Sequence, residues 1–135
     1  MSATSVETVR AFYDLFVAGK AEEAAETYLE KDFVLTNPLP APIPFGGRFV
    51  GAEGFLQYLG GILGAIEIED FVIEEMLGDG DRVVVVGREK SLVKATGRRY
   101  EMEWVHVLHA TDGRIVSMRE YNDTAAMRDA FEART

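Results

Sequence analysis

Side chains capable of acid–base chemistry lie on the strands expected in the C-terminal half of the chain. The residues two and four positions before His106 and before Glu120 are apolar. Arg88 and Lys90 are two residues apart on another expected strand. Carboxylates and histidines transfer protons, and basic side chains stabilise negative charge that develops on oxygen. The residue types therefore suggest a site with Glu120 as base and His106 as a hydrogen-bonding group. Arg88 or Lys90 would be its oxyanion partner.

Two of the expected strands, 99–110 and 114–122, place the acid–base residues among apolar ones. Successive side chains of a strand alternate between its two faces. In both strands the even positions are the more apolar, so we expect His106 and Glu120 to face the interior. The candidates for ligand contact, from these strands and elsewhere in the chain, are Asn37, Tyr58, Met102, Trp104, Met118 and Asn122.

In the strand expected over 82–94, the residues near the start are apolar on both faces. We assign the face with Arg88 and Lys90 to the interior and the face with Val83 and Val85 to the exterior. Apolar side chains on an outer face favour a second copy of the chain as the covering surface. The sequence thus predicts a homodimer.

Each of these residues also has a purely structural interpretation. Glu120 could form an ion pair with Arg88 or Lys90, and the two basic side chains could reach water at the sheet rim. His106 could be a hydrogen-bonded core residue, and the stripe around Trp104 could be ordinary core packing. Both interpretations stay open, as does the choice for Tyr58 between the pocket mouth and an amphipathic surface.

Periodicity and turn signals predict the elements that carry these residues. Helices are expected over 6–16, 21–29, 52–63 and from Asn122 or Asp123 to near Arg134, with Ser5 as the first N-cap. Strands are expected over 33–35, 67–77, 82–94, 99–110 and 114–122. All four prolines lie in 37–47, which is expected to be a loop. The pattern is that of one α+β domain over residues 1–135, with a curved antiparallel meander.

Composition excludes several classes of partner. The chain has 14 Lys and Arg against 23 Asp and Glu, a formal net charge of -9, which disfavours nucleic acid and anionic membrane surfaces. There is no cysteine, so disulfides and thiolate metal sites are excluded, and a cytoplasmic location is expected. No secretion signal or membrane-spanning run is visible. We expect a small-molecule ligand, no cofactor and no metal site.

Three motifs and the order of elements resemble a known family. The motifs are Thr96-Gly97-Arg98-Arg99-Tyr100, Asp112-Gly113-Arg114-Ile115-Val116 and Met118-Arg119-Glu120-Tyr121-Asn122-Asp123. They resemble the SnoaL-like branch of the nuclear-transport-factor-2-like (NTF2-like) fold, which includes ketosteroid-isomerase-related proteins, limonene-epoxide hydrolase and polyketide cyclases. The resemblance covers essentially the whole chain. It implies a cone in which helices and a concave sheet enclose an apolar pocket.

The isomerase pattern is not preserved at the corresponding positions. The resemblance places Asn37 where the isomerases have their aspartate base, and an amide cannot accept a proton at useful pH. It places Phe12, with Tyr13 beside it, near the oxyanion tyrosine, and His106 at the protonated aspartate. Isomerase chemistry of that type is therefore disfavoured.

The epoxide-hydrolase pattern is preserved in part. The resemblance maps its tyrosine to Leu35, its asparagine to Asn37 and its arginine to Arg88. One of its carboxylates becomes Lys90 and the last one is Glu120. The sequence thus leaves two hypotheses: acid–base chemistry on an apolar oxygenated substrate, or a non-catalytic ligand-binding or dimerisation module of the same fold.

Overall fold

Four consecutive strands form the main part of the sheet in the computed structural model, which describes residues 4–132. They are β3 (Ile66–Asp79), β4 (Arg82–Val93), β5 (Arg99–Thr111) and β6 (Arg114–Asn122), each antiparallel to the next. Asp112 and Gly113, between β5 and β6, have φ of 53° and 76°. Two positive φ values match the twist of a two-residue hairpin turn. The predicted antiparallel meander is confirmed.

Two further strands extend the sheet beyond β6. β1 (Leu29–Asn37) pairs parallel with β6, and β2 (Gly47–Val50) pairs antiparallel with β1. The strand order is β2-β1-β6-β5-β4-β3. The sequence predicts only the centre of β1 and misses β2. This four-residue strand has no periodicity of its own and depends on its pairing with β1.

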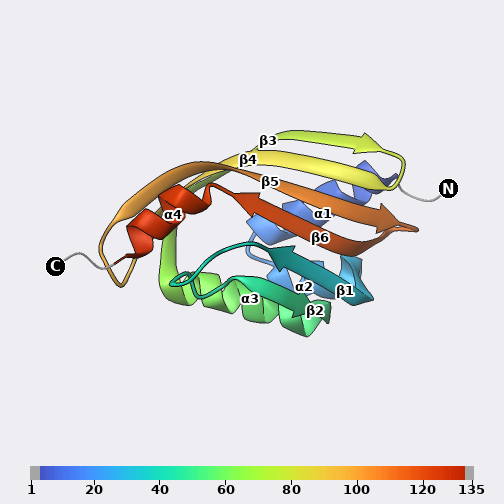
Figure 1. The fold of residues 1–135 in the computed structure, drawn as a ribbon. Helices are drawn as coiled ribbons and strands as arrows, with labels where there is room; N and C mark the ends of the chain where they lie inside the picture. Colours follow the sequence, from blue (N-terminus) through green and yellow to red (C-terminus); the bar gives the residue numbers. More distant parts are fainter. Residues whose placement is uncertain (1–3, 133–135) are drawn as a thin grey trace.

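The helices are α1 (Ser5–Val17), α2 (Ala21–Tyr28), α3 (Gly51–Ala65) and α4 (Thr124–Phe131). The first three lie under the arched sheet, and α4 lies near one end of β5 (Figure 1). Thr4, not the predicted Ser5, caps α1 in a capping box with Glu7, while the Ser5 hydroxyl donates to the Ala110 carbonyl. Asp123 caps α4. The predicted end near Arg134 lies outside the described residues.

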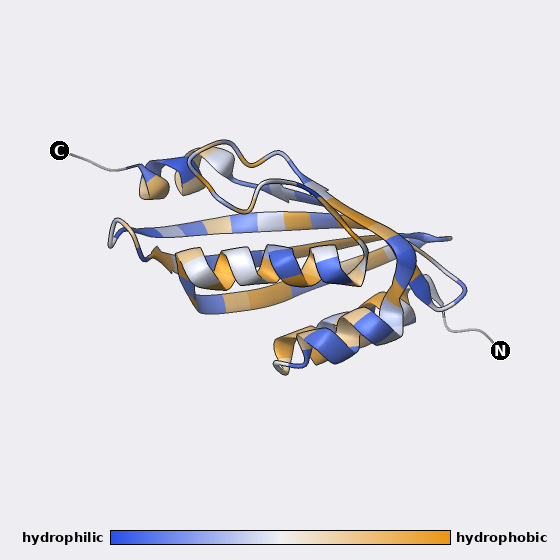
Figure 2. Ribbon diagram, turned by 90° about the horizontal axis from the view of Figure 1, so that it is seen from below, coloured by the Kyte–Doolittle hydropathy of each residue, from blue (hydrophilic) through white to orange (hydrophobic). Residues whose placement is uncertain are grey.

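Most of the apolar side chains pack between the helices and the concave face of the sheet. The alternation of hydrophilic and hydrophobic residues along the strands is visible in Figure 2. The even positions of β5 face inward as predicted, and Trp104 and Leu108 are almost fully buried. Val9, Phe12 and Tyr13 of α1 meet this layer from the helix side. The architecture is the predicted α+β fold, with helices on a curved, mostly antiparallel sheet.

The predicted orientation of β4 is wrong. Val83 and Val85 are fully buried, whereas Arg88 and Lys90 point outward, with side chains 55% and 47% exposed. Gly87 lies opposite Trp104, and the indole ring occupies the space above it. A one-residue shift would exchange the two faces, exposing the valines and burying two cations. The large ring and the cost of unpaired buried charge select the observed orientation.

This correction removes the argument for a homodimer. Val83 and Val85 belong to the interior, so they offer no outer surface for a second copy of the chain. Their outward neighbours, Val84 and Val86, are half-buried. The homodimer stays a prediction without this support.

Substituting Gly87 by alanine tests the packing that sets the orientation of β4. A Cβ there would overlap both the Trp104 ring and the carbonyl oxygen of Val72. We expect Gly87→Ala to lower the free energy of unfolding by about 1–3 kcal/mol, the usual cost of overpacking. Chemical denaturation measures it.

Gly60→Ala is the matched control. Gly60 lies in α3 with open space where an added Cβ would lie, and alanine is the better helix former. We expect this variant to be at least as stable as the wild type. If Gly87→Ala were equally stable, the close approach of Trp104 to β4 would not set the strand's orientation.

Candidate functional site

A cavity of about 380 Å³ lies between the concave face of the sheet and the helices α1 and α3. This volume is within the usual range for small-molecule sites. Aromatic rings supply much of the wall, and few polar groups interrupt it. The aromatic lining residues are Phe12, Tyr13, Phe16, Phe45, Phe55, Tyr58, Phe71, Tyr100 and Trp104.

Trp104 is at the centre of a stack of rings on the sheet side of the cavity. Its indole lies 4.9 Å from the Phe71 ring and 4.3 Å from the His106 ring, measured between centroids, with small interplanar angles. The Trp104 side chain is almost fully buried, and its Nε1–H has no hydrogen-bond partner among the described residues. The stack holds the imidazole of His106 in a fixed plane.

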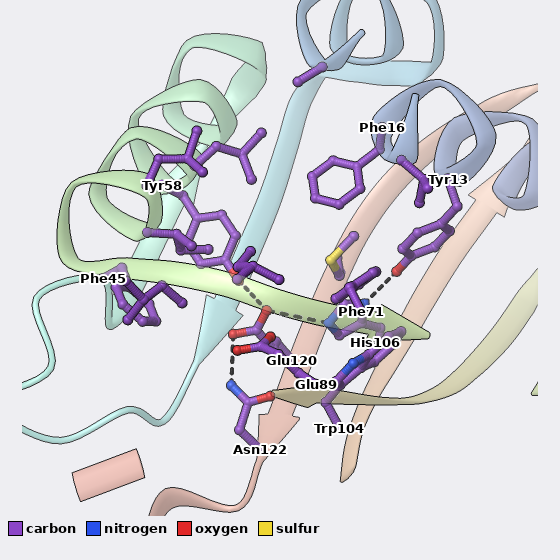
Figure 3. Close-up of a pocket in the computed structure, with 18 of the residues that line it drawn as sticks. Tyr13, Phe16, Phe45, Tyr58, Phe71, Glu89, Trp104, His106, Glu120 and Asn122 are labelled. Carbon is purple, nitrogen blue, oxygen red and sulfur yellow. Dashed lines mark hydrogen bonds and ion pairs between the residues drawn. The ribbon is translucent and has the colours of Figure 1, made fainter. Parts of the chain in front are cut away.

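Glu120 is the centre of a polar network at the buried side of the cavity. The Tyr58 hydroxyl donates to Oε2, Nε2 of His106 lies 3.3 Å from the same oxygen, and Nδ2 of Asn122 donates to Oε1 at 3.0 Å. Figure 3 shows these donors converging from α3, β5 and β6. Burial alone would raise the pKa of Glu120. The hydrogen bond from His106, the charge of its imidazole and the hydrogen bonds from Tyr58 and Asn122 together outweigh burial and hold the pKa below its ordinary value.

Tyr13 extends this network to α1. Its hydroxyl forms a hydrogen bond with Nδ1 of His106. An ionised Glu120 can only accept, so Nε2 of His106 carries a proton, and in the neutral ring Nδ1 accepts from Tyr13. Burial, reinforced by the charge of Glu120, raises the pKa of both Tyr13 and Tyr58 well above the ordinary value. Both tyrosines therefore stay protonated and donate.

Glu89 provides a second carboxylate in the same cavity. Its Oε2 accepts hydrogen bonds from the hydroxyls of Tyr100, at 2.7 Å, and Ser91, at 2.9 Å. Burial raises the pKa of Glu89, the two hydroxyls oppose this effect, and the negative charge of Glu120 adds to it. The net direction is upward. The pKa values of the two cavity carboxylates are thus shifted in opposite directions from that of an ordinary glutamate.

The cavity wall is acidic. Glu89 and Glu120 line it, and within residues 4–132 no lysine or arginine does. Arg88 and Lys90, the predicted oxyanion partners, lie on the opposite face of β4, where they approach Asp70 at 3.5 Å and Glu101 at 3.7 Å. The expectation that Arg88 or Lys90 faces the interior as an oxyanion partner is therefore wrong, because it depends on the inverted orientation of β4.

The other predicted site residues fall into two groups. Asn37 does not line the main cavity. Its Oδ1 accepts from the backbone N–H groups of Leu39 and Gly47, and its Nδ2 donates to the Phe45 carbonyl, so it braces the proline-rich loop. The predicted residues that do line the cavity are Glu120, His106, Tyr58, Met102, Trp104, Met118 and Asn122.

Sequence reasoning misses Glu89 and the contribution of Tyr13. It assigns Glu89 to the outer face of its strand together with Val83 and Val85. Gly87 is the signal that points to Glu89, since a glycine within a strand often marks a close approach by a bulky group. The sequence places Tyr13 only beside Phe12, near the position of the isomerases' oxyanion tyrosine, and does not show it as a partner of His106. Its hydrogen bond joins residues 93 positions apart, and no local pattern encodes such a distance.

Residues 4–132 contain neither a cluster of metal ligands nor a membrane-spanning helix. No group of three or more His, Cys, Asp or Glu side chains in this part of the chain is arranged to hold a metal ion. No helix within it is long and apolar enough to span a membrane.

Comparisons with known proteins agree on the fold. A family model described as a SnoaL-like domain matches residues 9–118. A crystal structure of an NTF2-like protein from Burkholderia xenovorans has 26% identity and a TM-score of 0.86, covering 98% of this chain and 100% of its own. An NTF2-like protein of unknown function from Burkholderia pseudomallei has 26% identity and a TM-score of 0.84, covering 97% and 99%.

A more distant neighbour carries a ligand. It is a protein with a ketosteroid isomerase-like fold from Catenulispora acidiphila in complex with trimethylamine, with 14% identity and a TM-score of 0.75, covering 95% of this chain and 94% of its own. No curated protein sequence matches the chain significantly. The solved structures confirm the NTF2-like fold that the resemblance implied.

Substituting Tyr58 by phenylalanine tests whether the network holds Glu120. The change keeps the ring and removes one donor to a buried carboxylate. Hydrogen bonds to charged groups contribute about 1.5–3 kcal/mol, so we expect Tyr58→Phe to lower the free energy of unfolding by that amount. Urea denaturation followed by circular dichroism gives the value.

Tyr121→Phe is the matched control. Tyr121 is 45% exposed on β6 and does not line the main cavity, so its loss of a hydroxyl should change stability by less than about 0.5 kcal/mol. If the two substitutions lowered the free energy of unfolding equally, the Tyr58 hydroxyl would not stabilise the buried carboxylate of Glu120.

Proposed function

The chain belongs to the SnoaL-like domain family, and we propose that its cavity binds a small, apolar, oxygenated molecule and moves protons on it without a cofactor. One observation carries the proposal: two carboxylates with free acceptor positions, Glu89 and Glu120, line one aromatic cavity. Aromatic and thioether side chains bind the apolar part of the ligand, chiefly those of Trp104, Met102 and Met118.

Glu120 is the proposed base. An ionised carboxylate offers about four acceptor positions, and Tyr58, His106 and Asn122 occupy three of them. The remaining position is on Oε1, where Asn122 is the one donor among the described residues. The lowered pKa of Glu120 keeps it ionised at neutral pH, so the proton-accepting form is the resident one.

Glu89 is the proposed acid. Both of its hydrogen bonds are to Oε2, which leaves Oε1 without a donor in the described part of the chain. Its raised pKa favours the protonated form, which can donate to a carbonyl or hydroxyl oxygen of the ligand. Two titratable groups whose pKa values are shifted in opposite directions are a typical arrangement for an acid and a base that act together.

His106, Tyr58 and Tyr13 act as positioning residues in this proposal. They fix the carboxylate of Glu120 and the tautomer of His106 but need not touch the ligand's reacting atoms. Arg88 and Lys90 take no part, because they lie outside the cavity. Asn37 acts only through the loop that carries Phe45 into the wall.

A second candidate function is non-catalytic ligand binding by the same cavity. The observation in its favour is that Glu120 already has three donors, as a purely structural buried carboxylate would. The two candidates differ in one measurable property, the transfer of a proton to or from a bound molecule.

Proton transfer can be measured without knowing the natural substrate. A simple methyl ketone in heavy water exchanges its α-protons when a base removes one and the enolate oxygen is protonated or hydrogen-bonded. In the return step a deuteron adds to carbon. We expect the wild-type protein to accelerate this exchange, followed by proton NMR, and Glu120→Gln to reduce the acceleration by about 100-fold or more.

Glu103→Gln serves as the control for charge. Glu103 is exposed on β5 and does not line the cavity, so its loss should leave the exchange rate unchanged. Wild-type-like exchange in Glu120→Gln would remove Glu120 as the base. Tight ketone binding without any accelerated exchange in the wild type would favour the non-catalytic alternative.

A further inference from the structure

Large apolar side chains remain exposed where the cavity opens to solvent. Val17 at the end of α1 is 60% exposed, Leu63 near the end of α3 is 62% exposed and Ile68 on β3 is 38% exposed. All three line the cavity, so together they form its mouth. Apolar surface left in water is unfavourable by roughly 25 cal/mol for each Å². We call these three residues the apolar mouth.

The buried side of the cavity has the opposite character. Glu120 and His106 are 6% and 8% exposed, and Tyr58 is equally buried. Their hydroxyl, imidazole and carboxylate groups converge on one region of the wall, as Figure 3 shows. The cavity therefore changes from polar and buried to apolar and exposed between this network and the mouth.

The charges at the buried side restrict the ligand's polar end. Glu120 is ionised at neutral pH, Glu89 is a second carboxyl group, and the described residues supply no lysine or arginine to the cavity wall to balance an anion. His106 is already engaged by Tyr13 and Glu120. A carboxylate or phosphate on the ligand would lie near like charge in a poorly solvated site, which is costly.

We infer that the cavity's ligand is an elongated amphiphile that binds with its polar end innermost. That end is an uncharged carbonyl or hydroxyl group, and the apolar body is long enough to cover Val17, Leu63 and Ile68. The inference rests on the proposed function, because it takes Glu89 and Glu120 to be the groups that meet the ligand's oxygen. Beyond that function, it specifies how long the ligand is and that its polar end is uncharged.

The length of the ligand can be tested with straight-chain methyl ketones of increasing size. Trp104 is the only tryptophan and lines the cavity, so its fluorescence reports binding. We expect affinity to rise by roughly threefold to fourfold for each added methylene while the chain grows toward the mouth. The rise should stop once the chain extends past Leu63 into water. Affinity independent of chain length would overturn the inference.

Serine substitutions locate the end of the chain. We expect Leu63→Ser and Val17→Ser each to weaken binding of a long ketone, methyl nonyl ketone, by roughly threefold or more, and to leave butanone binding unchanged. Leu77→Ser is the matched control, since Leu77 is 60% exposed but lies outside the cavity lining. Circular dichroism checks that each variant folds, and Ile68→Thr repeats the test with a β-branched residue suited to a strand.

The charge of the polar end is tested by comparing decyl alcohol with capric acid, which have equal chain length. At neutral pH we expect the acid to bind at least about tenfold more weakly than the alcohol. Equal or tighter binding of the acid would overturn the assignment of an uncharged end. If variants of the apolar mouth weakened both ketones equally, the mouth would not contact the apolar chain, and a protein partner would be the better explanation of its exposure.

The outcomes separate this inference from the proposed function. Chain-length dependence that is lost in Leu63→Ser, without any proton exchange, would support the ligand class and contradict catalysis. Exchange that depends on Glu120 but not on chain length would support catalysis and contradict the amphiphile.

Discussion

The rest of the site depends on how one buried carboxylate is satisfied. Glu120 lies on β6, and its partners come from two other elements and from its own strand: Tyr58 on α3, His106 on the neighbouring strand β5, and Asn122 two residues further along β6. A buried ionised carboxylate without such donors would be too costly to retain. Through His106 the network also includes Tyr13, so it joins α1 and α3 to the sheet on both sides of the cavity.

The same constraint explains the acidity of the cavity. Donors from Tyr58, His106 and Asn122 satisfy Glu120 without a lysine or arginine, so the carboxylate keeps its charge through hydrogen bonds and the nearby imidazole. Glu89 is influenced by this charge, and its pKa rises in response to burial and to Glu120. One carboxylate held ionised beside another displaced toward protonation gives the cavity an acid and a base from the same residue type. The protein's exterior and its cavity are therefore both acidic, for different reasons.

The fold could be predicted from sequence far better than the site could. Local signals located the meander, the proline-rich loop and the inner face of β5, which carries Met102, Trp104 and His106 at alternate positions. The orientation of β4 could not be predicted, because both of its faces begin with valines and the deciding contact is Gly87 beneath Trp104 on the next strand. That single inversion placed two surface cations in the pocket and left Glu89 out. Long-range contacts, not propensities, determine which charges a cavity contains.

In the cavity, Glu120 is held ionised, while the pKa of Glu89 is shifted toward its protonated form. Carbon-13 NMR of the protein labelled at the glutamate side-chain carboxyl carbons, titrated across pH, measures both groups directly, with Glu89→Gln and Glu120→Gln assigning the signals. We expect the pKa of Glu120 to lie below the ordinary glutamate range and the pKa of Glu89 to lie above it. Titration in the reverse order, or of both groups at the ordinary value, would show that the network does not hold Glu120 ionised beside a protonated Glu89.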